Sequence, residues 1–273
     1  MSEIENTPSP SGPPKRSKLI LESRTVINAA GMLFNIAAGK LKASKANQDQ
    51  PPIILLPGFG SDCRYLKPLS KFLNRHGYKT EDWGLGFNFA GQNLRHKLTD
   101  ISDKWDITPN HGYDPETYRG EGGVPYLCDL ATQKILKRAT ELDSQVILLG
   151  WSLGGYIARE VARDLPNQVA HVITLGAPVI GGPKYTAAAR YFSRKGFDLD
   201  WIEIESEKRN SKPIQQAITA IYSKSDAIVD WRATIDKINP NVEHIEVSAA
   251  HLGMGFSQKV WACILTALAT NEV

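Results

Sequence analysis

Short apolar runs recur along the chain from residue 53 onwards, separated by longer stretches of mixed polarity. The runs are rich in Ile, Val and Leu and lack regular alternation with polar residues. This pattern is typical of strands that are buried on both faces of a parallel sheet. The five expected strands are IILL (53–56), VILLG (146–150), HVITLG (171–176), AITAIYS (217–223) and HIEVS (244–248).

Helical patterns lie between and after these runs. Their apolar residues recur at the spacing of one helix face. The expected helices cover residues 64–77, 126–142, 156–165 and 257–269. Because strands and helices alternate, the sequence predicts an α/β fold with a mostly parallel central sheet flanked by helices.

The chain before residue 53 has a different character. Residues 1–18 are rich in Ser, Pro and charged residues, which predicts a disordered tail. Residues 19–40 carry a broad apolar stripe, and a polar linker follows, so we expect an amphipathic helix and linker over 19–52. Such a helix either packs on the domain or lies on a membrane surface.

Two long segments interrupt the domain expected over residues 53–273. Residues 91–124 are polar with Gly and Pro, and residues 181–213 combine aromatic and charged stretches. Because loops of this length are usually functional, we expect insertions that form a cap or lid over a binding cleft. The aromatic residues of the second insertion either line an acyl site or pack within a helical insert. They are Tyr185, Tyr191, Phe192 and Phe197.

Composition narrows the function classes. The chain has 273 residues and a net charge of +3, which is too small to favour nucleic acid as a partner. The three cysteines form no CxxC pair and no metal-ligand spacing, so neither a disulfide framework nor a metal site is expected. Neither a signal peptide nor a membrane-spanning run is evident. We therefore expect a cytoplasmic protein, peripheral to a membrane if residues 19–40 bind lipid.

GWSLGG (150–155) follows an apolar run and opens a helical pattern. A serine on such a strand-to-helix turn sits in a strained backbone that raises its hydroxyl above the sheet. Gly150 and Gly154 are small because larger side chains would collide in the turn. In this context Ser152 is the predicted nucleophile, and an idle serine in a structural turn is the alternative.

A serine nucleophile needs a histidine base and a carboxylate that orients it. Asp226 lies just past the run AITAIYS, and His251 follows the last run, in the chain order expected for this arrangement. Asp230 is the alternative carboxylate, four residues further on. The remaining histidines are expected to have surface or packing roles: His76, His96, His111, His171 and His244.

An oxyanion hole requires two backbone N–H groups that point at the developing charge. We expect the first from Leu153, at the start of the elbow helix, where N–H groups are free. The second is expected from Phe59 in the loop LPGFGS, with Gly58 supporting the turn. An ordinary turn is the alternative reading of this loop.

With these motifs in order, the chain resembles the α/β-hydrolase superfamily, and within it the lipases and carboxylesterases. The resemblance covers roughly residues 53–270 and rests on LLPGFG, GWSLGG, LGAP, YSKSDAIV and AAHLGMGF. It departs from the family in two places. Pro57-Gly58 stands where His-Gly is frequent, and no strand is evident before residue 53, so the sheet is expected to be reduced.

The resemblance implies acyl transfer through an acyl-enzyme, with no metal or organic cofactor. We therefore expect a serine hydrolase for carboxylic esters, with a small-molecule or lipid ester as substrate. The same triad would also serve an acyltransferase or a thioesterase. A non-catalytic binding protein on this fold is the alternative from a different class.

Overall fold

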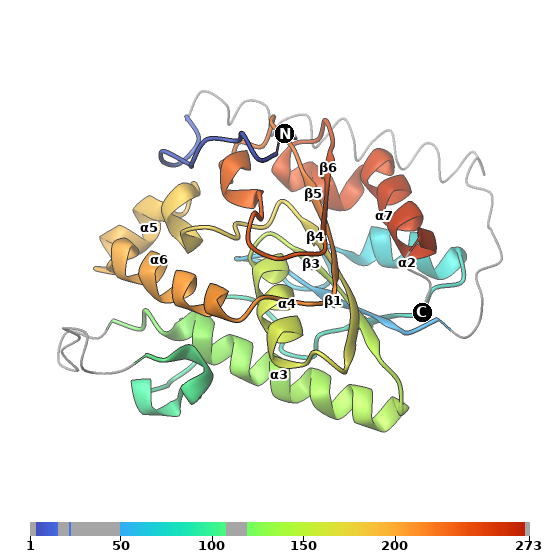
Figure 1. Cartoon of the computed structure of the whole chain (residues 1–273), viewed down its shortest axis with the longest axis horizontal. Coiled ribbons are helices and arrows are strands. Elements are labelled where there is room, and N and C mark those ends of the chain that lie inside the picture. Colours follow the sequence, from blue (N-terminus) through green and yellow to red (C-terminus); the bar gives the residue numbers. More distant parts are fainter. Residues whose placement is uncertain (1–3, 16–21, 23–49, 108–118, 271–273) are drawn as a thin grey trace.

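The computed structural model describes residues 4–15, 22, 50–107 and 119–270 (Figure 1). At its centre is a six-stranded sheet in the order β2-β1-β3-β4-β5-β6, and all neighbouring strands are parallel. The expected α/β fold with a parallel sheet is confirmed. The strands are β1 (Ile53–Leu56), β2 (Thr80–Asp82), β3 (Val146–Trp151), β4 (Val169–Leu175), β5 (Ala217–Tyr222) and β6 (Val242–Glu246).

Helices cover both faces of the sheet (Figure 1). Helices α2 (Lys67–Arg75) and α7 (Gln258–Thr270) pack on one face, and α3 (Gly123–Leu142) and α4 (Leu153–Asp164) pack on the other. Alternate residues of each strand supply the two cores. In β1, for example, Ile53 and Leu55 face α2 and α7, whereas Ile54 and Leu56 face α3 and α4.

Strand β2 was not expected from the sequence. Its three residues, TED, are partly exposed and polar, so the apolar pattern that marks the other strands is missing. The strand nevertheless pairs with β1 because the edge of the sheet needs only backbone groups to extend it. The first expected insertion, 91–124, contains two short helices, η2 (Leu98–Asp100) and η3 (Asp103–Trp105). Its residues 108–118 lie outside the part of the chain that the structure describes.

The second expected insertion, 181–213, is a group of short helices between β4 and β5. We call it the cap. It consists of η4 (Gly182–Tyr185), α5 (Ala189–Arg194), α6 (Leu199–Lys208) and η5 (Arg209–Ser211). Phe192 and Phe197 pack with Phe59, Val124 and Leu153, which joins the cap to the loops above the sheet.

A buried ion-pair network fixes the end of the cap to helix α4. The Arg209 guanidinium lies 2.9 Å from both Glu160 and Asp164, and all three side chains are almost fully buried. The guanidinium also lies 4.5 Å from the centre of the Trp105 ring. Burial alone would lower the pKa of Arg209, but the two carboxylates outweigh it and raise that pKa.

We expect Arg209→Ala to lower the free energy of unfolding by at most about 3–5 kcal/mol, because Glu160 and Asp164 would lose one buried cation and keep only Arg163 and Lys104 as partners. Urea denaturation measures this change. Arg64→Ala is the control, since Arg64 also pairs with a carboxylate, Asp62, but is 83% exposed. An equal effect of the two substitutions would show that the buried network does not anchor the cap.

The N-terminal tail is described over residues 4–15. Lys237 Nζ donates hydrogen bonds to the carbonyls of Glu5 (3.0 Å) and Thr7 (2.6 Å), and Thr7 is buried, so part of the expected disordered tail lies against the domain. The amphipathic helix and linker expected over 19–52 lie outside the described residues, except for Glu22 and residues 50–52.

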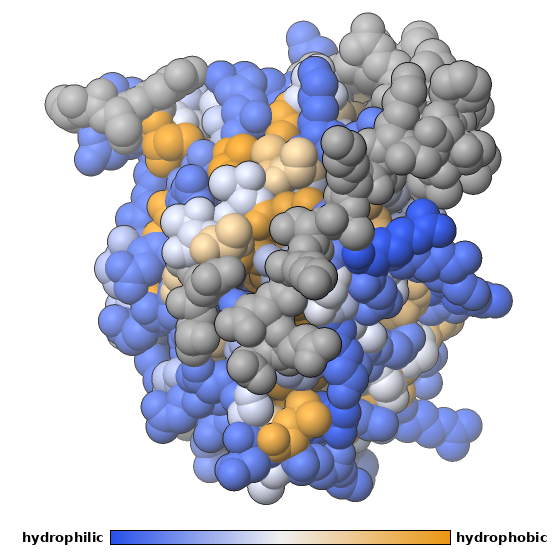
Figure 2. Space-filling view, turned by 90° about the vertical axis from the view of Figure 1, so that its right-hand side faces the viewer, coloured by the Kyte–Doolittle hydropathy of each residue, from blue (hydrophilic) through white to orange (hydrophobic). Residues whose placement is uncertain are grey.

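Figure 2 shows the face on the right of Figure 1. Its coloured surface is hydrophilic at the margins, and apolar residues gather in the upper middle of the view, with a separate group near the bottom. Folded proteins keep much apolar area on their surface. Within the residues that the structure describes, no helix combines the length and the apolar character needed to cross a membrane.

Candidate active site

Ser152 lies at the turn between β3 and α4, with backbone angles φ 54° and ψ −125°. A positive φ is costly for a residue with a side chain, so the turn must be held by its surroundings. Its N–H donates to the Leu175 carbonyl at 2.8 Å. A Cβ on Gly150 would lie 2.3 Å from the Gly154 carbonyl oxygen, and one on Gly154 would lie 2.2 Å from that of Leu56. Only glycines allow this approach of helix and strand.

Asp226 and His251 meet at the carboxyl edge of the sheet. His251 Nδ1 lies 2.6 Å from Asp226 Oδ2, and both residues are almost fully buried. Asp226 Oδ1 accepts the N–H groups of Ile228 (2.8 Å) and Val229 (2.7 Å), which fixes the carboxylate. A proton on Nδ1 in this pair leaves Nε2 as the free basic nitrogen.

Gly176, from the LGAP segment, gives this pair its space. Its φ is +56°, and a Cβ there would lie 3.1 Å from His251 Nδ1 and 3.2 Å from Asp226 Oδ2. A side chain at this position would therefore press against the carboxylate–imidazole pair. The LGAP motif, on which part of the family resemblance rests, thus has a glycine at this position for a steric reason.

Ser152 and His251 line the same cavity. Within the described part of the chain no hydrogen bond joins their side chains. Catalytic hydrogen bonds are often long before substrate binds and tighten in the complex. The geometry therefore brings the three predicted residues to one site, and their catalytic roles stay a prediction.

Asp230, the alternative carboxylate, has a different partner. Its Oδ1 accepts the backbone N–H of Arg232 at 3.0 Å, and its side chain also pairs with the Arg232 guanidinium at 3.2 Å. It caps the short helix η6 (Trp231–Thr234) and does not contact His251 through any hydrogen bond among the described residues.

The other described histidines have structural contacts. His76 and His96 each bond a backbone carbonyl nearby, and His244 Nε2 accepts the N–H of Asp236. His171 is buried in β4, where burial lowers its pKa to about 4 and keeps it neutral. His111 lies outside the described residues.

The loop after β1 carries the predicted oxyanion donor Phe59. The N–H of Gly60 bonds the Asn88 carbonyl at 2.8 Å, and that of Ser61 bonds the Gly58 carbonyl at 3.2 Å. No hydrogen bond within the described part uses the N–H of Phe59. The N–H of Leu153 is likewise free, as expected for the first residue of α4. Both donors are thus available at the cavity that Phe59, Ser152 and Leu153 line.

Asn88 is a supporting residue that the sequence analysis missed. Its side chain is fully buried, with Nδ2 donating to the Pro57 carbonyl (2.8 Å) and Oδ1 accepting from the Ala90 N–H (3.0 Å). It therefore ties the loop after β1 to the segment that follows β2. Only its place between Phe87 and Phe89 could have drawn attention to it.

Glu22 is the second residue that the sequence analysis missed. Its Oε1 accepts the N–H groups of His251 (3.1 Å) and Ala227 (3.2 Å), and its Oε2 accepts that of Leu252 (2.9 Å). One carboxylate thus holds together the loops that carry Asp226 and His251. Charge-assisted hydrogen bonds of this kind are about twice as strong as neutral ones.

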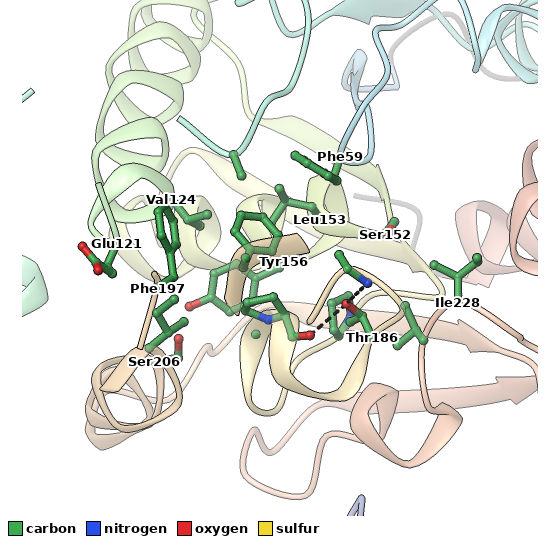
Figure 3. Close-up of a pocket in the computed structure, with 18 of the residues that line it drawn as sticks. Phe59, Glu121, Val124, Ser152, Leu153, Tyr156, Thr186, Phe197, Ser206 and Ile228 are labelled. Atoms are coloured by element: carbon green, nitrogen blue, oxygen red, sulfur yellow. Dashed lines mark hydrogen bonds between the residues drawn. The ribbon is translucent and has the colours of Figure 1, made fainter. Parts of the chain in front are cut away.

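A cavity of ≈ 160 Å³ opens beside Ser152 (Figure 3). Apolar residues of the cap and of the loops above the sheet form most of its wall. Of the four aromatic residues considered for an acyl site, Phe192 and Phe197 line the cavity, whereas Tyr185 and Tyr191 do not. The Tyr185 hydroxyl bonds Glu203 and that of Tyr191 bonds Gln92.

No metal-binding site is evident in the part of the chain that the structure describes. No group of three His, Cys, Asp or Glu residues there is arranged to hold a metal ion. The three cysteines are free thiols, and burial raises the pKa of Cys63 to about 12, which makes it unreactive at neutral pH.

Many solved structures of similar fold are α/β-hydrolases. A monoacylglycerol lipase of Paleococcus ferrophilus is similar at a TM-score of 0.51 and 14% identity, over 82% of this chain and 97% of that one. A membrane phospholipase A, described as a bacterial virulence factor, gives 0.54 and 11% over 94% and 99%. A metagenome-derived lipolytic enzyme gives 0.53 and 12% over 84% and 95%.

The chain therefore has the α/β-hydrolase fold, as its motifs led us to expect. No protein-family model and no curated protein sequence gives a match. At these identities the likeness establishes the fold, and the activity has to be argued from the site.

The pairing of His251 predicts different effects for the two candidate carboxylates. Asp226→Asn should lower kcat for ester hydrolysis by about 10⁴-fold, because the amide favours the wrong imidazole tautomer. Asp230→Asn should cost less than tenfold, since Asp230 caps a short helix and pairs with Arg232 rather than with His251. Steady-state kinetics with one activated ester measures both. The reverse ranking would move the acid to Asp230.

Glu22 should matter for the reactivity of the site more than for folding. In Glu22→Gln the amide oxygen can replace only part of the three hydrogen bonds, so we expect about a tenfold lower kcat with KM little changed. Glu243→Gln, an exposed carboxylate on β6, is the matched control. Equal kcat values for the two variants would show that Glu22 does not help to position His251.

Proposed function

We propose that the protein is a serine hydrolase that cleaves carboxylic esters, and that lipid-like acyl esters are its substrates. One observation carries the proposal. A strained serine stands at an apolar cavity that it shares with a histidine whose other ring nitrogen is held by a buried carboxylate. Fold likeness to lipolytic enzymes is consistent with this site and does not by itself assign the activity.

In the proposed mechanism, His251 Nε2 takes the proton of the Ser152 hydroxyl as Oγ attacks the ester carbonyl carbon. Asp226 stabilises the imidazolium through Nδ1. The oxyanion of the tetrahedral intermediate accepts the N–H groups of Phe59 and Leu153. His251 then gives its proton to the leaving alkoxide, and the acyl group remains on Ser152.

Hydrolysis of the acyl-enzyme repeats these steps with water. His251 takes a proton from the water as its oxygen attacks the acyl carbonyl, and Ser152 leaves with that proton. The largely apolar wall, which includes Phe192, Phe197 and Ile228, supports an apolar chain as the group that the cavity takes. Another alcohol in place of water would give acyl transfer, and a thioester could enter by the same first step. Product analysis with added alcohols and with acyl thioesters separates these reactions.

A fluorophosphonate probe tests the nucleophile without a choice of substrate. The Ser152 oxygen should displace fluoride and form a phosphonyl ester, detected by mass spectrometry on the peptide that contains Ser152. Ser152→Ala and His251→Ala should give no adduct and should lower kcat for ester hydrolysis by at least about 10³-fold. Ser193→Ala, at an exposed position of α5, is the control and should label like the wild type.

Two outcomes would contradict the proposal. Folded protein that forms no adduct and hydrolyses no ester would point to a binding protein on this fold. A hydrolysis rate that falls steeply for acyl chains longer than butyrate would leave an esterase, but one without a lipid-like substrate.

A further inference from the structure

The cavity beside Ser152 has a polar end that the proposed reaction does not use. Tyr156, Glu205, Ser206 and Glu121 line it together with the apolar residues. In Figure 3, Ser152 and Ile228 lie on one side of the cavity, whereas Glu121 and Ser206 lie on the other. Tyr156 stands between them, and its hydroxyl is directed toward Ser206 and away from Ser152.

Two buried polar atoms at this end have hydrogen-bonding capacity left over. Among the described residues, nothing forms a hydrogen bond with Glu205 Oε2, and the Tyr156 hydroxyl has only the Ser206 side chain near it, in no hydrogen bond of normal geometry. Tyr156 is 6% exposed and Glu205 is 4% exposed, so bulk water does not solvate them. Buried polar groups are normally satisfied, and orphaned ones in a cavity point to a ligand that would complete them.

Helix geometry explains why the same cavity joins these atoms to the nucleophile. Ser152 is the residue before α4 and Tyr156 is the fourth residue of that helix, so the first turn of α4 carries the Tyr156 side chain into the cavity that Ser152 also lines. An apolar chain attached to Ser152 would lie along the apolar wall, which includes Leu153 and Phe192. Because Ser152 and Ser206 lie on opposite sides of the cavity, with Tyr156 between them, we expect a chain of several carbons to be needed to reach the polar end.

The charge of the polar end selects the kind of group that would bind. Glu205 Oε1 already pairs with Lys208 Nζ at 2.7 Å, which leaves Oε2 as an acceptor in a locally neutralised pair. An ammonium group buried there would bring a second cation to one carboxylate. A neutral hydroxyl needs no counter-charge, and it can donate to Glu205 and accept from Tyr156 at the same time.

We propose that the cavity takes esters whose apolar chain ends in a neutral hydroxyl group, and that Tyr156 and Glu205 bind this hydroxyl. The proposal rests on the ester hydrolase function proposed above and specifies its substrate. It makes both residues determinants of specificity that lie away from the reacting atoms.

The test compares p-nitrophenyl esters of hexanoate, octanoate and decanoate with the same esters hydroxylated at the terminal carbon. The wild type should give a kcat/KM at least about tenfold higher for the hydroxylated ester at the length that reaches Tyr156, since even one added hydrogen bond of ordinary strength changes a rate by about this factor. Tyr156→Phe and Glu205→Gln should each lower the ratio of the two kcat/KM values, because each leaves only one of the two groups that bind the hydroxyl.

Tyr126→Phe is the matched control, because Tyr126 belongs to α3 and does not line the cavity. It should keep the wild-type ratio. Tyr156→Phe and Glu205→Gln change different elements, α4 and α6, so misfolding of one variant still leaves the other as a test. Because each readout is a ratio within one protein sample, a partial loss of folded protein does not alter it.

Failure of this proposal can be told apart from failure of the function. Hydrolysis of the plain esters with a ratio of about one at every length would overturn the hydroxyl site and leave the ester hydrolase in place. A stronger preference for a terminal ammonium than for a hydroxyl would also overturn it. An absence of both ester hydrolysis and fluorophosphonate labelling would overturn the two proposals together.

Discussion

The backbone conformation of Ser152 is the constraint on which the rest of the site depends. A non-glycine residue at φ 54° costs about 1–3 kcal/mol, and it persists only where its surroundings over-determine it. Here the first turn of α4 lies so close to the ends of β1 and β3 that Gly150 and Gly154 leave no room for a Cβ. The same close approach exposes the N–H of Leu153 at the start of the helix. One steric arrangement therefore positions both the Ser152 hydroxyl and the N–H that we propose as an oxyanion donor.

The parallel sheet explains why the remaining groups meet there. In a parallel sheet the carboxyl ends of all strands lie at one edge, so loops that follow different strands become neighbours. Phe59 follows β1, Asp226 follows β5 and His251 follows β6. The sequence analysis could predict these positions because each depends only on recognising a buried strand and counting past its end. Its position nearer the strand end favoured Asp226 over Asp230 in the sequence, and the loop geometry adds that Asp226 contacts His251 whereas Asp230 pairs with Arg232.

Other parts could not be read from the pattern. Glu22 acts across 229 positions of sequence on the N–H of His251, and no local pattern encodes a contact of that range. Asn88 resembles any turn residue until its two backbone partners are known. Strand β2 is short, polar and at the sheet edge, so it lacks the apolar signal that identified the other strands. The aromatic residues of the cap could not be assigned for a similar reason. Whether each side chain points into the cavity depends on how the cap packs, and the sequence pattern does not determine that packing.

The polar end of the cavity is best understood through its cost. A buried hydroxyl without a partner destabilises a fold by about 1–3 kcal/mol, and Phe in place of Tyr156 would avoid this at the same volume. Helix α4 bears such a cost because strong contacts hold it to the cap, above all Arg209 between Glu160 and Asp164. Glu160 and Asp164 belong to α4, as Tyr156 does, and Arg209 directly follows α6, which carries Glu205. Rigid support on either side keeps the polar groups of Tyr156 and Glu205 directed into the cavity. Because these groups are already desolvated in the folded protein, a ligand that forms hydrogen bonds with them does not have to remove water from them first.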